Sequence, residues 1–276
     1  MELVSDNSKG IITLPRIYKG ADLKFISVTG GKGGVGKSSI SVNLAIALGA
    51  LGGRVLILDG DLGLANADQL LGINVSNTLY DVVRGNILLE EAIVTTKWNV
   101  DLLPTASGRR EMVEMDEGMR VDLIETVRGL HDRYEYVVID TAAGIGDTAM
   151  NLAAAGDIVL GVTTPDPTSV RDVFSVMKVL SKEFGVKNFE LLSNKVKHRA
   201  EGKDLYRRIS GVAGRFLPIH MGYAGFVLRD PSLAKSIIER TPLMASYPSS
   251  PAAQQISALA RSLVTLSKQR SEAHEA

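Results

Sequence analysis

The stretch Lys24-Phe-Ile-Ser-Val-Thr-Gly-Gly-Lys-Gly-Gly-Val-Gly-Lys-Ser38 contains three successive residue patterns. It begins with a short apolar run rich in β-branched residues, continues with a glycine-rich segment, and leads into a helical apolar period after Lys37 and Ser38. This order predicts a strand, a loop and a helix. Residues 31–38 match G-x-x-x-x-G-K-[ST], the pattern of a loop whose backbone surrounds phosphate groups.

Each part of this pattern has a physical reason. Glycines let backbone N–H groups approach phosphates closely, and the following helix directs the positive end of its dipole toward the anion. Lys37 is expected to reach the β- and γ-phosphates, and Ser38 is expected to ligate Mg²⁺. The nucleotide-binding residues predicted for this loop are Gly31, Lys32, Gly33, Gly34, Val35, Gly36, Lys37, Ser38 and Ser39.

Composition narrows the class of protein. The 276 residues are 45% hydrophobic, enough for one large α/β domain, which we place at residues 24–270 between an arm (1–23) and a polar tail (271–276). The chain has no cysteine, which excludes disulfides and thiolate metal sites. Its formal charge is zero, so no global field favours nucleic acid, and no apolar run is long enough for a membrane span. We expect a cytoplasmic protein.

Two further apolar runs predict buried strands that end in aspartate. The run 54–58 leads to Asp59-Gly-Asp61, and the run 136–139 leads to Asp140. Ligands bind at the carboxyl ends of parallel strands. We predict that Asp140 holds Mg²⁺ through water and that Asp61, a third metal-site residue with Ser38 and Asp140, orients the attacking water; the alternative for Asp61 is a helix cap. Gly144, in the small-residue loop after Asp140, is expected to approach the γ-phosphate as part of a switch.

The rest of the chain continues to alternate strands with helices. Strands are predicted at 158–163, 189–193 and 216–223, and the first of them is followed by a helix that Asp166 or Thr168 can cap. The alternation predicts a doubly wound, mainly parallel sheet with helices on both faces. Asn194 follows the strand at 189–193, where its amide can present a donor and an acceptor to adenine; a turn is the alternative.

A second lysine inside the loop, Lys32, makes the pattern narrower, and the loop resembles the deviant Walker A motif of the MinD/ParA family of dimeric ATPases. Residues 59–72 and 140–147 are most similar to the flagellar-number regulators of that family, called FlhG or FleN. The resemblance implies the P-loop fold of that family, ATP and Mg²⁺ as ligands, and a homodimer formed on ATP binding. In that dimer Lys32 would cross to the partner's nucleotide, Asp61 would be catalytic, and Asn194 would read adenine.

The resemblance also implies partners. They are a flagellar signal-recognition-type GTPase (FlhF-like), flagellar switch-ring proteins or a flagellar transcriptional activator, although residues 1–23 contain no Asp-Gln-Ala-x-x-Leu-Arg element. Arg229 and Asp230 lie where the family contacts adenine, but the usual proline-acidic element is absent.

Two functions from other classes stay open at this point. The first is a ParA-like DNA or cargo partitioning ATPase, for which the basic stretch 195–208 is only a weak indication; an ordinary solvated helix face is the preferred explanation, and DNA is not an expected partner. The second is a MinD-like division-site regulator whose last helix, with Ile256, Leu259 and Leu263 on one face, touches the membrane reversibly and weakly. Packing of this helix on the sheet is the simpler expectation.

Overall fold

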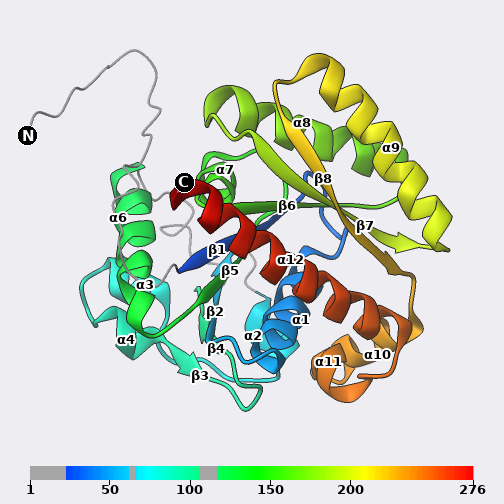
Figure 1. The fold of residues 1–276 in the computed structure, drawn as a ribbon. Helices are drawn as coiled ribbons and strands as arrows, with labels where there is room; N and C mark the ends of the chain where they lie inside the picture. Colours follow the sequence, from blue (N-terminus) through cyan, green and yellow to red (C-terminus); the bar gives the residue numbers. More distant parts are fainter. Residues whose placement is uncertain (1–22, 62–65, 106–116, 276) are drawn as a thin grey trace, which may run out of the picture.

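The computed structural model describes residues 23–61, 66–105 and 117–275; most of the expected arm, residues 62–65 after Asp61, and residues 106–116 lie outside these ranges. The described residues form one sheet with the strand order β3-β4-β2-β5-β1-β6-β7-β8, parallel except between β3 and β4 (Figure 1). Its strands are β1 (Lys24–Thr29), β2 (Val55–Gly60), β3 (Val94–Thr95), β4 (Asp101–Leu103), β5 (Tyr136–Thr141), β6 (Ile158–Thr163), β7 (Asn188–Val196) and β8 (His220–Leu228).

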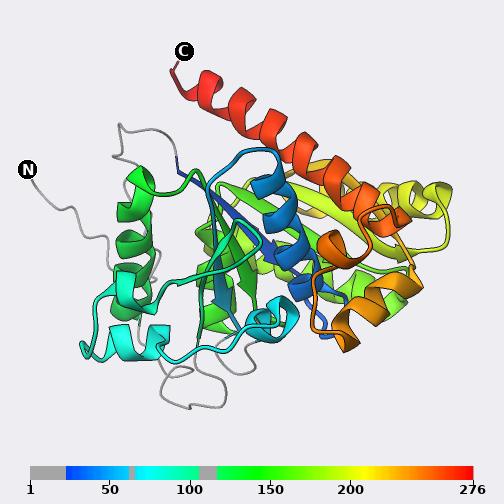
Figure 2. The same cartoon turned by 90° about the horizontal axis from the view of Figure 1, so that it is seen from below.

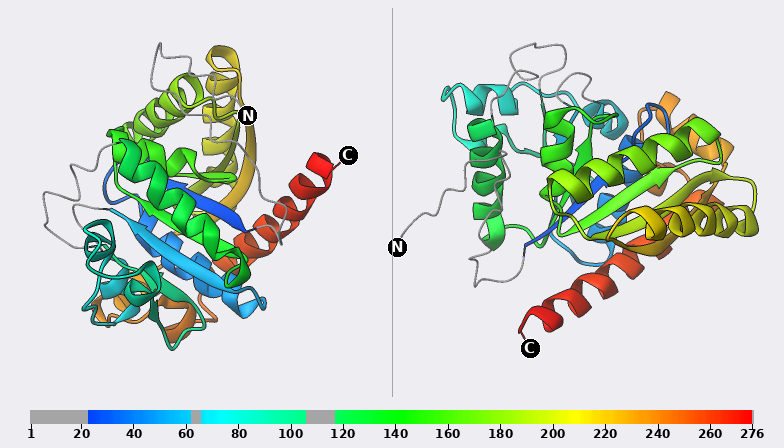
Figure 3. Two further views of the ribbon diagram at one scale, coloured as in Figure 1. Left: turned by 90° about the vertical axis from the view of Figure 1, so that its left-hand side faces the viewer. Right: turned by 90° about the horizontal axis from the view of Figure 1, so that it is seen from above.

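Helices cover both faces of this sheet, as the alternation of apolar runs predicts. Figures 1 and 2 show α1 and α12 side by side over one face, and Figure 3 shows α8 and α9 over the other. The first face carries α1 (Lys37–Ala50), α2 (Ala67–Leu71), α10 (Pro231–Ile238), α11 (Leu243–Ser246) and α12 (Pro251–Glu275). The second carries α3 (Leu79–Val83), α4 (Leu89–Ala92), α6 (Glu117–Arg128) with the short 3₁₀ turn η1 (Gly129–Asp132), α7 (Asp147–Ala154), α8 (Pro167–Glu183) and α9 (Arg199–Phe216).

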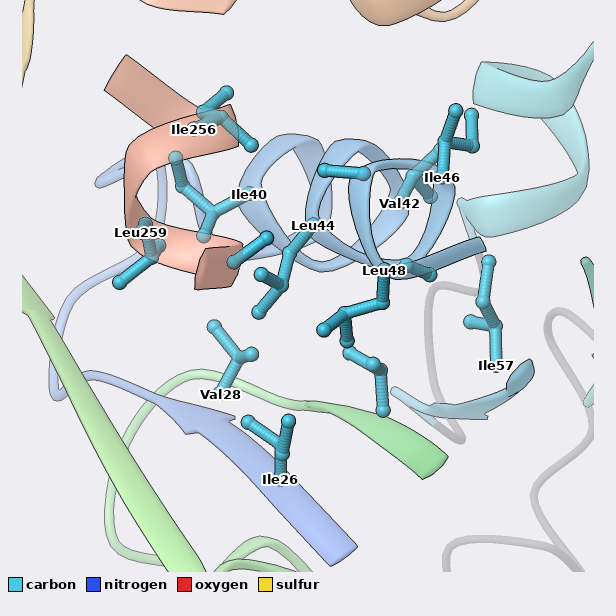
Figure 4. Packing of buried hydrophobic residues seen from close by; sticks show 14 of the residues in the cluster. Ile26, Val28, Ile40, Val42, Leu44, Ile46, Leu48, Ile57, Ile256 and Leu259 are labelled. Atoms are coloured by element: carbon cyan, nitrogen blue, oxygen red, sulfur yellow. The ribbon is translucent and has the colours of Figure 1, made fainter. Parts of the chain in front are cut away.

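Successive side chains of a strand point to opposite faces of the sheet, so the buried residues form a separate core on each face. On β1, Ile26 and Val28 point toward α1, whereas Phe25 packs in the cluster below α6 and α7. Figure 4 shows Ile40 of α1 next to Ile256 of α12, and Leu44 of α1 pointing toward Val28 of β1. Because the central strands β1, β2, β5 and β6 bury both of their faces, their sequences are nearly continuous apolar runs rather than alternating ones.

The last helix packs on the sheet. Three residues of its apolar face, Ile256, Leu259 and Leu263, are at most 2% exposed in the core with α1, which confirms the simpler expectation for this helix. The helix continues to Glu275, through the residues that we expected to form a polar tail, and its end extends beyond the sheet (Figure 2). None of the helices in the described ranges is long and apolar enough to cross a membrane.

One strand begins later than predicted. We expected a strand from Phe216 to Tyr223, but α9 continues to Phe216 and β8 starts at His220. The apolar run misled the prediction because Phe216 belongs to the helix, where its side chain is 70% exposed, rather than to the sheet. Pro218 restricts the backbone of the residue before it and separates the two elements.

Candidate nucleotide-binding site

The predicted loop joins β1 to α1 and has the backbone of a phosphate-binding loop. Gly34 and Gly36 have φ values of 76° and 100°, which residues with a Cβ rarely adopt. A Cβ at Gly31 would lie 2.2 Å from the carbonyl oxygen of Asp172, and one at Gly36 would lie 2.5 Å from Nδ2 of Asn194. Three of the loop glycines are therefore required by conformation or by close packing, and the loop ends at the N-terminus of α1.

Lys37, the first residue of α1, carries the positive charge in the centre of the site. Its side chain is buried, and burial lowers the pKa of its ammonium, while the negative charges of Asp140 and Asp61 act in the opposite direction. The three side chains therefore lie close enough to interact electrostatically, as the prediction for a shared phosphate and metal site requires.

Asp140 lies near the carboxyl end of β5, opposite Val28 in the sheet register. It is 1% exposed, and burial raises its pKa to about 6 in spite of hydrogen bonds from the hydroxyls of Ser38 and Ser41. Ser41 Oγ lies 3.0 Å from Oδ1 of Asp140, whereas Oδ2 is buried with no hydrogen-bond partner. An unsatisfied carboxylate oxygen beside Ser38 fits the water-mediated magnesium position that the sequence predicts.

No group of three or more His, Asp or Glu in the described ranges could enclose a metal ion by itself. Mg²⁺ commonly binds through one or two protein ligands, several waters and the phosphates of its nucleotide. The residues present, Ser38 and Asp140 with Asp61 nearby, fit that mode of binding and would hold the ion only together with a nucleotide.

A second acid, Asp59, was not predicted from the sequence and lies beside Asp140 in the register of β2 and β5. Its carboxylate accepts hydrogen bonds from the backbone N–H groups of Asp61 at 3.2 Å and of Asn66 and Ala67 at 3.1 Å. Asp59 therefore anchors both ends of the stretch that carries Asp61 and makes the contact with the start of α2 that we considered for Asp61. The spacing Asp-x-Asp was the available signal for this second acid.

The two switch positions lie at neighbouring strand ends. Asp61 follows β2 and is half-buried, and Gly144 follows β5 with a φ of 96° and with nothing within 4 Å of the place that a Cβ would occupy. Gly144 therefore has the conformational freedom that a switch requires. Residues 62–65, between Asp61 and α2, lie outside the described ranges.

Lys32 points away from the centre of the loop toward the start of α8. Its ammonium lies 2.8 Å from Oδ2 of Asp166 and 2.6 Å from Oγ1 of Thr168. Asp166 also caps α8 by accepting the N–H of Thr168 at 2.8 Å, which confirms the expected cap. Because the Lys32 and Asp166 side chains are 40% and 46% exposed, solvent competes for this ion pair, and it can open at little cost.

The base side of the site is an open cavity of about 520 Å³ between the loop, Pro165 and the ends of β7 and β8. Asn194 lies fully buried beside this cavity, where its amide donates to Val35 O and accepts from the N–H of Lys195. Arg229 lines the cavity, whereas the carboxylate of Asp230 accepts the N–H groups of Ser232 and Ala252 at the starts of α10 and α12. Burial alone would raise the pKa of Asp230, but the hydrogen bonds that its carboxylate accepts outweigh burial, so the pKa is lowered.

Comparison with known proteins now adds to this geometry. The model of an AAA domain family, AAA_31, matches residues 23–189, more than half of the chain. The antiactivator FleN of Pseudomonas aeruginosa is 38% identical over 87% of this chain and 85% of its own length. The chain belongs to the MinD/ParA family of ATPases. Within that family it is most like the FleN and FlhG proteins.

Other relatives of this MinD/ParA-family ATPase agree. The flagellum site-determining protein YlxH of Helicobacter pylori is 33% identical over 88% of this chain and 82% of its own. The septum site-determining protein MinD of Pyrococcus horikoshii, solved with Mg-ADP, has a TM-score of 0.75 at 29% identity and covers 89% of this chain and 98% of that one. The comparison confirms the predicted P-loop NTPase fold, with ATP and Mg²⁺ as the ligands of this ATPase.

The nucleotide-free ATPase is expected to become less stable as the pH rises from 5.5 to 8. Burial first, and the neighbouring Asp140 second, raise the pKa of Asp59 to about 7, and burial raises that of Asp140 to about 6. Because the ordinary value is 3.8, both acids favour the folded protein most strongly below that pH, and this stabilisation is lost as the pH passes about 6 and then about 7.

We expect the unfolding temperature to fall on the order of 5 °C across this interval. Differential scanning calorimetry without nucleotide measures it, and the Asp59→Asn protein is the control, with a shallower dependence because one titrating acid is removed. An equal slope in both proteins would assign the effect to other groups.

Proposed function

We propose that this protein is an ATP-dependent dimerisation switch that regulates the number or placement of flagella. The proposal rests on the position of Lys32, the second lysine of the loop. The ammonium of Lys32 points away from the centre of its own loop and lies on the exposed rim beside Asp166. A cation in that place is accessible to the nucleotide of a facing subunit once the ion pair with Asp166 opens.

The chemistry would rest on positioning and charge. The loop N–H groups and Lys37 would hold the phosphates, and Ser38 and Asp140 would hold Mg²⁺, which would supply charge neutralisation when bound. Asp61 orients the attacking water, and Lys32 of each subunit stabilises the charge that develops in the site of the other. Loss of the γ-phosphate then releases Gly144 and its loop, and the two subunits separate.

The names of two relatives support the flagellar assignment, because one is an antiactivator and the other determines the site of the flagellum. The partners that fit such a switch are a flagellar signal-recognition-type GTPase, the switch-ring proteins or a transcriptional activator. These partners place its action in the cytoplasm. Membrane contact through α12 is not part of the proposal, because the apolar face of that helix packs in the core.

The Asp61→Ala protein tests the switch. Without the residue that orients water, hydrolysis should fall at least about 100-fold, and the ATP-bound state should therefore accumulate. We expect light scattering after size exclusion to give a monomer with Mg-ADP and a dimer with Mg-ATP. A mass that is the same with both nucleotides would contradict the dimerisation switch while leaving the ATPase assignment intact.

The flagellar role is tested separately in a flagellated bacterium that lacks its own FleN or FlhG protein. Expression of this chain should restore the normal number and position of flagella in electron micrographs, and the Lys32→Ala protein should not. Rescue by both proteins would show that the flagellar role does not depend on Lys32-mediated dimerisation. Rescue by neither would contradict the flagellar assignment.

A further inference from the structure

Two consecutive residues at the end of β7 bind the same loop. Nδ2 of Asn194 donates to the carbonyl oxygen of Val35 at 2.7 Å, and Nζ of Lys195 donates to the carbonyl oxygen of Gly34 at 2.7 Å. Successive side chains of a regular strand point to opposite faces of the sheet. The local backbone must therefore be unusual for both side chains to reach one loop.

The end of β7 departs from regular geometry at this point. The pairing of β7 with β8 is irregular between Ser193 and Val196, and Lys195 has a φ of 55°, in the left-handed region that disfavours lysine. The N–H of Lys195 turns back to Oδ1 of Asn194 at 2.8 Å. A strained non-glycine residue at the edge of a ligand site indicates that its side chain, here that of Lys195, is needed at that position.

The two contacts fix the direction of two N–H groups in the loop. In a trans peptide the C=O and the N–H point in opposite directions. When Lys195 holds the carbonyl of Gly34 toward β7, the N–H of Val35 points away from β7, and Asn194 does the same for the N–H of Gly36. These N–H groups belong to the part of the loop that surrounds the phosphates.

We infer that Lys195 is a positioning residue of the ATP site, which holds the Gly34–Val35 peptide so that its N–H is directed at the phosphates. Gly34 needs such support, because its φ is 76°, it is exposed, and nothing lies within 4 Å of where a Cβ would be. Packing therefore does not prevent this peptide from rotating. Asn194 supports the next peptide from a buried position, and Lys195 supports this one from the rim.

This inference rests on the loop being the ATP site, and it differs from a role in reading the base. Lys195 lines the base-side cavity, so a direct contact with adenine is the competing explanation. The two roles predict different ligand dependence. A residue that orients loop N–H groups affects every ligand that carries the phosphates, whereas a base contact affects only ligands that carry the base.

The test compares Lys195→Met and Lys195→Gly with the wild type by displacement of a fluorescent ADP analogue. ATP, GTP and inorganic tripolyphosphate are the three competitors. We expect both variants to bind all three competitors about tenfold more weakly, because the loop loses one charge-assisted hydrogen bond. Lys195→Gly should unfold at no lower temperature than the wild type, because glycine adopts a positive φ without strain. Lys195→Arg, which keeps a donor, should recover most of the affinity.

Lys203→Met is the control for the loss of one charge, because Lys203 lies exposed on α9 and does not line the cavity beside the loop. Weaker ATP binding with unchanged tripolyphosphate binding would overturn the inference in favour of a base contact. Unchanged binding of all three ligands by Lys195→Met would overturn it as well. If the wild type itself bound none of them, the ATP site and the inference would fail together.

Discussion

The Lys32→Ala protein is expected to bind ATP nearly as tightly as the wild type and to hydrolyse it at least about 100-fold more slowly. Binding should persist because Lys32 lies 2.8 Å from Asp166 and 2.6 Å from Thr168, outside the cradle of its own subunit. Turnover should fall because, in the proposed dimer, this cation stabilises the charge on the partner's phosphates. Phosphate release measures turnover, and light scattering with Mg-ATP measures the accompanying loss of dimer.

Asp166→Asn is the matched control for this change. Asparagine caps a helix as well as aspartate does, so the hydrogen bond from the N–H of Thr168 to Oδ1 is kept. The negative charge that holds Lys32 is lost, and the hydrogen bond from Lys32, which lowers the pKa of Asp166 in the wild type, is weakened. We expect this variant to dimerise with ATP at least as readily as the wild type. Normal dimers of Lys32→Ala would show that the cross-subunit role is wrong.

The parts of the site that depend on neighbouring residues could be predicted from the sequence. The apolar run before Gly30, the glycines of the loop and the helical period after Ser38 all lie within one short segment, and each has its own pattern. Asp140 was predicted for the same reason, because an apolar run that ends in an acid indicates a strand reaching the ligand edge. The cap at Asp166 follows from Pro167, which favours the first turn of a helix.

Contacts between distant segments could not be predicted in this way. Asn194 binds Val35 across 159 positions, and Lys32 binds Asp166 across 134. Which polar groups meet there depends on the order of the strands and on the irregular end of β7, and no local pattern specifies either. The Asp-x-Asp spacing marks Asp59 as a second acid, but its role was missed because its partners are backbone N–H groups, which no residue type in the sequence identifies.

The Lys37→Met protein is expected to lose ATP binding by roughly 100-fold or more without becoming less stable at pH 6. Binding falls because the ammonium at the start of α1 is the charge expected to contact the β- and γ-phosphates. Stability should not fall, since burial disfavours this ammonium strongly enough to lower its pKa despite Asp140 and Asp61. Methionine fills similar space without that cost.

The choice of pH matters because the change leaves Asp140 without its neighbouring cation. The pKa of this acid is already about 6, so near that pH it can take up a proton instead of remaining an uncompensated buried charge. At pH 8 it cannot, and the same variant should be less stable than the wild type. Calorimetry at both pH values, with Lys203→Met as the charge control, measures this difference. An equal loss of stability at both pH values would mean that Lys37 stabilises the fold by packing rather than by charge. An ATP affinity equal to that of the wild type would mean that the phosphates do not bind at this loop.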